Sequence, residues 1–340
     1  MDEKRSVDRA GAAYLILFAA LLAFNQVVIK VTGQGFNPVF QAGLRSLIAC
    51  LAVALWMRVL SIPFAVPRKA VVWAVLSGIL FTLEFILLFV ALDLTTVSRS
   101  SILFYSMPVW LGIAAHFLLP GERLNRTKAI GMALALSGVV LALADQGDRD
   151  GNLIGDLCAL GATFGWAAIN LMVRITPLSE MRPQSQLLYQ LVISALIMLA
   201  ISPLFGTLLR DPNWLHYSGL MFQSIVVVCF GFVFWFWILK QYKASGVATF
   251  SFLSPVLAVL FGWLLLGERM QPQAWMALGL VALGIYLVNR RGISVCLVDR
   301  SSTPCGIKAR SAAARSPDRP PGWRFGEVSA TPGPFSDMKR

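Results

Sequence analysis

Charged side chains inside long apolar stretches are the first candidates for chemistry in this sequence. Three of them stand away from loops and from the ends of the stretches: Arg45, Glu84 and Arg99. In a hydrocarbon interior a charge costs several kcal/mol unless it faces a partner or a water-filled cavity, so each is a functional candidate by default. The two arginines suit an anionic or zwitterionic ligand, and Glu84 suits a ligand-binding or proton-binding site.

Prolines, polar groups and aromatic rings inside apolar stretches form a second set of candidates. Pro108 and Pro255 lie near the middle of two stretches, where proline removes an intrahelical hydrogen bond and kinks the helix. Each proline marks either a packing kink or a broken helix that lines a cavity, with the freed carbonyl satisfied by neighbours. The other members of this set are Asn25, Tyr105, Trp166, Asn170, Gln190 and Ser254.

The composition indicates that membrane-spanning helices position these residues. Hydrophobic residues make up 57% of the chain and charged residues 14%, whereas soluble domains carry about 25% charged residues. The mean hydropathy is +0.71. Because a spanning helix needs about 20 mainly apolar residues, we expect an all-α membrane protein. Its ten predicted spans are residues 12–30, 39–57, 70–92, 97–119, 127–144, 155–173, 185–204, 218–239, 247–266 and 273–289.

The distribution of basic residues predicts the orientation of the chain. With a cytoplasmic N-terminus, the cytoplasmic loops carry ten Lys and Arg residues and the opposite loops carry four, which agrees with the positive-inside rule. We therefore expect a multi-pass protein of the cell inner (plasma) membrane with both termini cytoplasmic. The net charge of +12 does not indicate nucleic-acid binding, because no binding motif accompanies it. The five cysteines lack metal-ligand spacing, so we expect neither a metal nor a cofactor.

A duplicated pattern runs through the chain. Residues 97–143 are echoed by residues 244–288, with Pro108 corresponding to Pro255 at a shift of 147. In each copy an apolar run with a proline is followed by a Gly-Glu-Arg triplet and a second apolar run, and the triplets correspond at a shift of 146. Such internal self-similarity indicates an architecture built from repeats.

The duplication predicts the domain organisation. We expect residues 1–144 and 155–289 to form two five-helix repeats joined by the acidic loop 145–154, and residues 290–340 to form a basic, disordered tail. Because five is an odd number, the second repeat must enter the membrane inverted. Inverted repeats are a recurring construction of secondary transporters, whose substrate site lies near the midplane where the halves meet.

The Gly-Glu-Arg triplets have a structural interpretation. Gly121 and Gly267 follow a predicted helix end, where a left-handed residue is favoured. Glu122 and Glu268 precede the next helix, whose positive dipole end suits a carboxylate. We interpret the triplets mainly as helix caps, and a gating role for the glutamates is the alternative.

Two of the three charges are predicted to lie at similar depths in the membrane. At a rise of about 1.5 Å per residue, Arg45 lies roughly 10 Å and Glu84 roughly 12–15 Å below the outer face, while Arg99 lies about 5 Å below it and can snorkel outward. Arg45 and Glu84 form either a structural ion pair or a substrate or proton site. The second half has Gln190 where Arg45 would recur and an apolar residue where Glu84 would recur. We therefore expect any ion coupling to depend on the first half.

At this level of detail the chain resembles the EamA-type members of the drug/metabolite transporter superfamily over roughly residues 12–289. The resemblance rests on the duplicated Pro and Gly-Glu-Arg pattern and on the segments LLAFNQVVIK, AGLRSLIA and GWAAINLMVRI. It implies ten helices in two inverted repeats around a central cavity, alternating access, and export of amino acids, metabolites or drugs. Members commonly carry tryptophan where Leu22 stands here, while Trp166 is kept.

These observations favour a secondary transporter that moves a small organic solute across the inner membrane, with export as the expected direction. The expected partners are the solute and the lipid bilayer. Protons as the coupling ion and a homodimer are left open. An intramembrane lipid-modifying enzyme and a non-transporting receptor are the alternatives. The enzyme lacks support, because the spans hold no evident nucleophile–base set or metal site.

Overall fold

The computed structural model of the protein describes residues 8–64, 66–119, 125–144, 152–242, 250–269 and 271–289. Within these ranges the named elements are helices, and Phe36 pairs with Leu209 in an isolated antiparallel bridge. The all-α prediction is confirmed for this part of the chain. The first Gly-Glu-Arg triplet, most of the loop 145–154 and the tail 290–340 lie outside the described residues.

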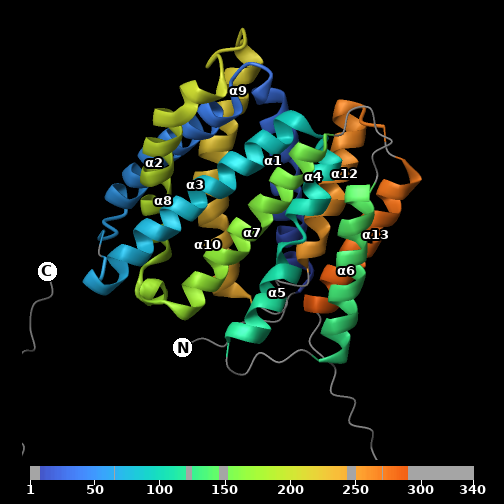
Figure 1. The fold of residues 1–340 in the computed structure, drawn as a ribbon. Helices are drawn as coiled ribbons and strands as arrows, with labels where there is room; N and C mark the ends of the chain where they lie inside the picture. The colour runs from blue at the N-terminus through green and yellow to red at the C-terminus, as the bar shows by residue number, and fades with distance from the viewer. Residues whose placement is uncertain are drawn as a thin grey trace, which may run out of the picture. The chain divides into compact units, whose positions relative to one another are not determined.

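The helices pack against one another as a bundle, drawn in Figure 1. The N-terminal half, residues 8–144, contains α1 Arg9–Gly33, α2 Pro38–Val59, η1 Arg68–Ala70, α3 Val71–Leu94, α4 Val97–Phe104, α5 Met107–Leu118 and α6 Arg126–Ala144. The C-terminal half, residues 152–289, contains α7 Leu153–Ile175, η2 Pro177–Glu180, α8 Pro183–Ile201, η3 Ser202–Phe205, α9 Trp214–Met221, η4 Phe222–Phe230, α10 Gly231–Gln241, η5 Phe250–Phe252, α12 Leu253–Leu266 and α13 Pro272–Asn289.

Most of the predicted spans correspond to helices that can cross a bilayer. Among the described residues, eight helical segments have the necessary length and apolar composition, and they match the first eight predicted spans. The last two, Leu253–Leu266 and Pro272–Val288, are apolar but shorter. The protein is therefore a multi-pass membrane protein, and the count of ten spans stays a prediction.

The fourth predicted span is broken at its proline. α4 ends at Phe104 and α5 begins at Met107, directly before Pro108. Proline cannot donate to the carbonyl four residues earlier, but the hydroxyl of Thr163 in α7 lies 3.4 Å from the Phe104 oxygen and donates to the Leu103 oxygen at 3.0 Å. A neighbouring helix thus satisfies the freed backbone, as a broken helix inside a membrane requires.

The second proline has a different position from the one expected. Pro255 lies in the first turn of α12, directly after the short 3-10 helix η5, and not in the middle of a helix. In a first turn the missing backbone N–H costs no intrahelical hydrogen bond. At the other end of α12, Gly267 has a φ of +65°, so the left-handed helix end predicted there is confirmed.

Glycines allow the last helix of each half to approach its counterpart closely. A Cβ atom on Gly284 of α13 would lie 2.5 Å from the Gly131 carbonyl oxygen of α6, and one on Gly138 would lie 2.7 Å from the Ala277 oxygen. Small residues are the usual means by which membrane helices pack backbone to backbone. α6 and α13 therefore have no room for a side chain at these crossings.

Candidate functional site

Arg45 of α2 is buried without the partners that its charge requires. Its side chain is 5% exposed, and its Nε and Nη1 atoms have no hydrogen-bond acceptor among the described residues. The guanidinium carbon lies 4.5 Å from the ring centroid of Phe85 and 5.8 Å from that of Phe89, both on α3. These rings stabilise the cation through their π faces but leave its N–H groups available to a ligand.

Glu84 of α3 is the nearby opposite charge. Glu84 is 4% exposed. Its carboxylate makes no hydrogen bond or ion pair with Arg45 or with any other described residue. The two charges attract each other without direct contact. Gly165 of α7 makes space beside Glu84, because a Cβ atom there would lie 3.2 Å from the Glu84 Cβ atom. The structural ion pair, one of the two expectations for these residues, is not formed.

An aromatic group forms another part of the same region. Trp166 of α7 stacks on Phe104 with ring centroids 4.9 Å apart, and its ring meets that of Tyr105 edge-on at 6.3 Å. Phe104 and Tyr105 belong to the apolar cluster that also includes Phe89, and Trp166 packs against this cluster. Tyr105 directly follows the last residue of α4, at the break before Pro108.

α1 meets the aromatic group at Leu22 and carries two buried polar residues just beyond it. The Tyr105 hydroxyl donates to the Leu22 carbonyl oxygen at 3.3 Å, which ties the broken span to α1. Asn25, one turn further along α1, is 7% exposed and its Oδ1 atom has no partner. The neighbouring Gln26 likewise has an unpartnered Oε1 atom. These oxygens are free acceptors in a buried setting, which an incoming N–H or O–H donor would satisfy.

Other candidates have structural partners. Asn170 donates to the Trp166 carbonyl oxygen of its own helix at 2.9 Å. Gln190 of α8 donates to Ser77 of α3 at 2.8 Å and so joins two helices. Ser254 is buried in the first turn of α12, and Pro108 lies in the first turn of α5. The structure does not bring Gln190 into the Arg45 and Glu84 region by any described contact.

A buried ion pair among the described residues involves Asp156, a residue that the sequence did not single out. Arg99 of α4 pairs with Asp156 of α7, with Nε lying 3.2 and 3.1 Å from the two carboxylate oxygens. Thr95 donates to the same carboxylate at 2.9 Å. Asp156 is fully buried and Arg99 is 5% exposed. The prediction that Arg99 snorkels outward is therefore wrong, because a carboxylate in the first turn of α7 holds it inside.

Glu268 caps a helix other than the one expected. Its carboxylate accepts from the backbone N–H groups of Val97 at 2.6 Å and Ser98 at 3.0 Å, and from the Ser98 hydroxyl at 2.5 Å. It therefore caps α4 of the opposite half, whereas the sequence predicted that it would serve the following helix, α13. Gly262 makes room for it, since a Cβ atom there would lie 2.6 Å from the carboxylate.

More polar contacts gather at this end of the bundle, which we call the α3–α4 end because α3 stops and α4 starts there. Lys30 of α1 donates to the carbonyl oxygens of Leu92 at 3.0 Å and Thr95 at 2.6 Å. Arg210, from the segment before α9, pairs with Asp93 at 2.7 Å. The chain is thus tied together here by contacts between segments far apart in the sequence.

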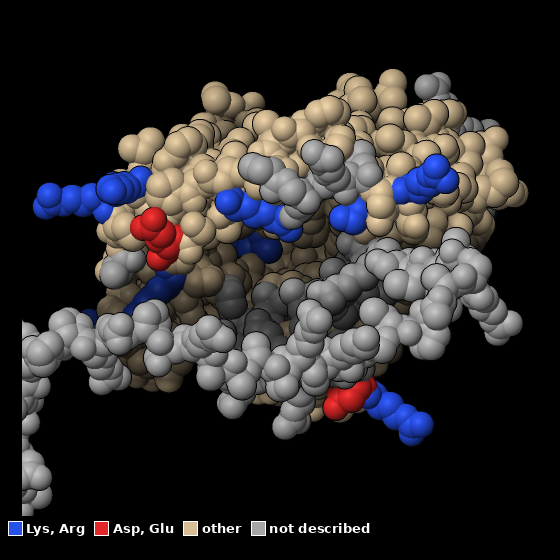
Figure 2. Space-filling model, turned by 90° about the horizontal axis from the view of Figure 1, so that it is seen from below, with Lys and Arg blue, Asp and Glu red and all other residues tan. Residues whose placement is uncertain are grey.

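The opposite end presents another surface. Figure 2 views the bundle from that side and shows a hollow with Lys and Arg side chains along its upper and left rim. Basic residues stand at the helix ends on this side, among them Arg58 in the last turn of α2 and Arg68 and Lys69 before α3. Among the described residues, no group of three or more His, Cys, Asp or Glu side chains is placed to hold a metal ion.

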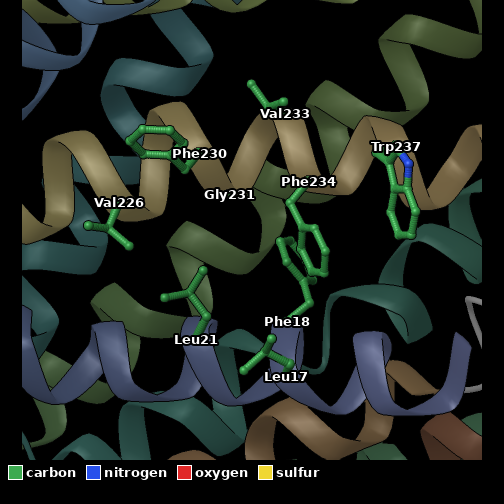
Figure 3. A pocket seen from close by; sticks show the side chains of 9 residues that line it. All are labelled: Leu17, Phe18, Leu21, Val226, Phe230, Gly231, Val233, Phe234 and Trp237. Atoms are coloured by element: carbon green, nitrogen blue, oxygen red, sulfur yellow. The ribbon is translucent and has the colours of Figure 1, made fainter. Parts of the chain in front are cut away.

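A separate apolar pocket of about 550 Å³ lies between α1 and the η4–α10 segment. Figure 3 shows the nine side chains or backbones that line it, which include Phe18, Phe230, Phe234 and Trp237. Phe230 is 63% exposed, as expected of a ring that faces lipid. The pocket has no charged lining residue, so it differs in kind from the Arg45 and Glu84 region.

Comparison with known proteins adds a family relationship. The profile of the EamA-like transporter family matches residues 9–144 and 153–290. The uncharacterized transporter YoaV of Bacillus subtilis is 24% identical over 278 residues, which cover 80% of this chain and 94% of that protein. A "Probable amino-acid metabolite efflux pump" of Escherichia coli is 26% identical over 297 residues, covering 83% and 95%. A solved crystal structure at 20% identity has a TM-score of 0.58 over 82% of this chain and 98% of its own, which supports the fold.

Proposed function

Since this chain belongs to the EamA-like transporter family, we propose that it is a secondary transporter that moves a small organic solute by alternating access. The observation that carries the proposal is the pair of buried, oppositely charged side chains without direct partners, Arg45 and Glu84. Leaving them so costs free energy that only a ligand, a proton or water can recover. A transport site is a place where such ligands come and go.

The solute that fits this pair carries both charges. The free N–H groups of Arg45 suit a carboxylate, and the carboxylate of Glu84 suits an ammonium group. Tyr105 and Trp166, which pack in the same apolar cluster as Phe89, and the unpartnered Asn25 oxygen of α1 suit the apolar and polar parts of a small metabolite. The relative named as an amino-acid metabolite efflux pump supports this solute class and export as the direction.

Glu84 is also our candidate for proton coupling. The same carboxylate can hold either a proton or the cationic group of the solute, but not both at once. Competition between the two for one carboxylate is a simple way to exchange one for the other. The C-terminal half offers no equivalent acid, because Phe230 and Gly231 stand at the corresponding positions. Coupling, if it occurs through a carboxylate of this region, therefore depends on α3.

The wider architecture of the proposal is a ten-helix protein of the inner membrane with two inverted five-helix repeats around the cavity. The two separate matches to the family profile, residues 9–144 and 153–290, support the repeat. The basic residues around the hollow in Figure 2 support a cytoplasmic placement of that end. The α3–α4 end then faces the outside.

Flux into liposomes tests the proposal. The purified protein is reconstituted with a pH gradient and offered amino acids, their amides, which lack the carboxylate, and their N-acyl derivatives, which lack the ammonium group. We expect gradient-dependent flux of the zwitterions. Arg45→Gln and Glu84→Gln should each reduce it about 100-fold, the effect of losing one buried charge-assisted contact to the solute. Arg58→Gln and Glu180→Gln, at exposed positions, are the matched controls.

Each outcome has a distinct meaning. Binding of a solute without any flux would indicate a receptor. Flux that both buried-charge variants retain, with an unchanged pH dependence, would place the transport site elsewhere. Equal flux of zwitterions, amides and N-acyl derivatives would retain the transporter and reject the solute class.

A further inference from the structure

We propose that the polar contacts at the α3–α4 end form a latch that closes the transport pathway on that side and must open once in every cycle. The latch consists of the Arg99–Asp156 ion pair and the Glu268 cap on α4. The inference rests on the proposed transport function, because a latch has a purpose only if the end it closes has to open.

Both contacts of the latch join the two halves of the chain. Arg99 and the N-terminus of α4 belong to the N-terminal half, and their partners Asp156 and Glu268 belong to the C-terminal half. They hold α4 against α7 and α12, so they break when α4 separates from these two helices at this end.

The latch leaves no space for a solute to pass. Asp156 is fully buried, and Arg99 and Glu268 are 5% and 8% exposed. Next to the ion pair, Gly155 of α7 packs so closely that a Cβ atom would lie 3.0 Å from the Thr95 backbone nitrogen. Next to the cap, a Cβ atom on Gly262 would lie 3.0 Å from the Ser98 hydroxyl oxygen. The opposite end shows the hollow of Figure 2, so the structure describes a state closed at the latch.

The chemistry of the latch suits reversible closure. Apolar surface exposed to water on opening costs about 25 cal/mol per Å², which would hold a purely hydrophobic seal shut. Charged groups instead exchange their protein partners for water, and buried ion pairs contribute little net stability compared with their hydrated components. Arg99, Asp156 and Glu268 can therefore separate at low net cost when water enters from the outside.

A disulfide across the latch tests whether this end opens. The Gly262 Cβ position lies 3.0 Å from the Ser98 side-chain oxygen, a separation that suits the Cβ and sulfur atoms of a disulfide. The same Cβ atom would lie 2.6 Å from the Glu268 carboxylate and displace it, so the test compares the oxidised with the reduced form of one double variant. In a background without the five native cysteines, the Ser98→Cys/Gly262→Cys protein links α4 to α12 when oxidised. We expect oxidation to abolish flux and reduction to restore it, while each single variant is insensitive to both. Equal flux of the oxidised and reduced double variant would overturn the latch.

Accessibility gives a second test that does not need flux. Ser101 of α4 is buried below the latch and its hydroxyl has no partner, so Ser101→Cys is a conservative probe. We expect a membrane-impermeant thiol reagent added from the outside to label it about tenfold faster after Glu268→Gln or Asp156→Asn, in proportion to the weakened charge-assisted hydrogen bonds. Asp93→Asn, which loosens an exposed ion pair at the same end, is the control and should change labelling little. Unchanged labelling in all three variants would assign the contacts to static packing.

The two tests separate the latch from the transport function. If the Glu268→Gln or Asp156→Asn change speeds labelling of the Ser101→Cys protein, but the protein transports none of the amino acids, amides or N-acyl derivatives, the latch is supported and the proposed function is contradicted. Solute flux that is equal in the oxidised and the reduced double variant would support the transporter and contradict the latch.

Discussion

The described part of this membrane protein buries the charges Arg99 with Asp156 and Arg45 with Glu84, and these two arginine–carboxylate pairs differ in how their charges are satisfied. Arg99 and Asp156 are in direct contact, and Thr95 donates to the same carboxylate. Arg45 and Glu84 are equally buried, yet they make no direct contact with each other and Arg45 retains two unpartnered nitrogen atoms. Burial alone therefore does not distinguish a structural charge from a functional one. The partners around the charge do.

The two pairs should also differ in the effect that a substitution has on the free energy of unfolding. A charge with direct hydrogen-bonded partners loses them when either member is replaced, whereas Arg45 and Glu84 have no direct hydrogen bond to each other to lose. Loss of the first pair should thus lower the stability of the closed structure that the latch holds, while loss of the second should leave the stability nearly unchanged and act on transport. Substitutions that keep the shape of the side chain can separate these effects.

The largest effect on stability is expected at the satisfied pair. Asp156→Ala removes the buried carboxylate that Arg99 contacts, and breaking a buried pair in this way costs about 3–5 kcal/mol of unfolding free energy. The measurement is denaturant or thermal unfolding of the purified protein in detergent. Adding Arg99→Met should recover most of the loss, because it removes the buried cation as well. A stability of Asp156→Ala close to that of the wild type would show that the pair is not a structural contact.

A smaller effect is expected at the unsatisfied pair. Glu84→Gln keeps the side-chain volume and removes a charge that has no hydrogen bond with any described residue, so the unfolding free energy should change by less than about 1 kcal/mol. The same unfolding assay checks this, alongside the flux measurement. A loss as large as that of Asp156→Ala would mean that Glu84 is structural and that the contrast between the pairs is wrong.

The smallest effect is expected at an exposed pair. Arg210 and Asp93 bind each other at 2.7 Å with side-chain exposures of 36% and 23%. Exposed ion pairs contribute about 0–1 kcal/mol, so Arg210→Gln should lower the unfolding free energy by less than about 1 kcal/mol. Raising the salt concentration should remove the difference. A loss that persists at high salt would instead implicate the hydrogen bond from Arg210 to the Gly33 carbonyl oxygen.

Much of this fold could be predicted from the sequence because hydrophobic length is its main determinant. The first eight spans and the break near Pro108 follow from apolar runs and from the chemistry of proline. Arg45 and Glu84 could be singled out because a charge in the middle of an apolar run is conspicuous. The sequence could not show that the two side chains make no direct contact, because depth along a helix does not specify the direction in which a side chain points.

The remaining polar contacts depended on neighbours that sequence alone does not identify. Asp156 stands at the second residue of its predicted span and was therefore counted as part of the boundary. Asp156 and Arg99 have similar predicted depths in the membrane, and this similarity is the feature of the sequence that suggests an ion pair between them. Glu268 was assigned to the next helix because local capping rules consider only adjacent segments, whereas its partners lie 170 residues away in the sequence.

The close approach of α6 and α13 has a mechanical consequence. With Gly131, Gly138 and Gly284 at the crossings, the two helices touch through their backbones, and pulling them apart would strip both of their tightest van der Waals contacts at once. Sliding is equally restricted, because any residue shifted into the crossing would bring a side chain. Rotation about the line of contact disturbs these contacts least. α6 and α13 can therefore rotate about their line of contact more readily than they can separate or slide.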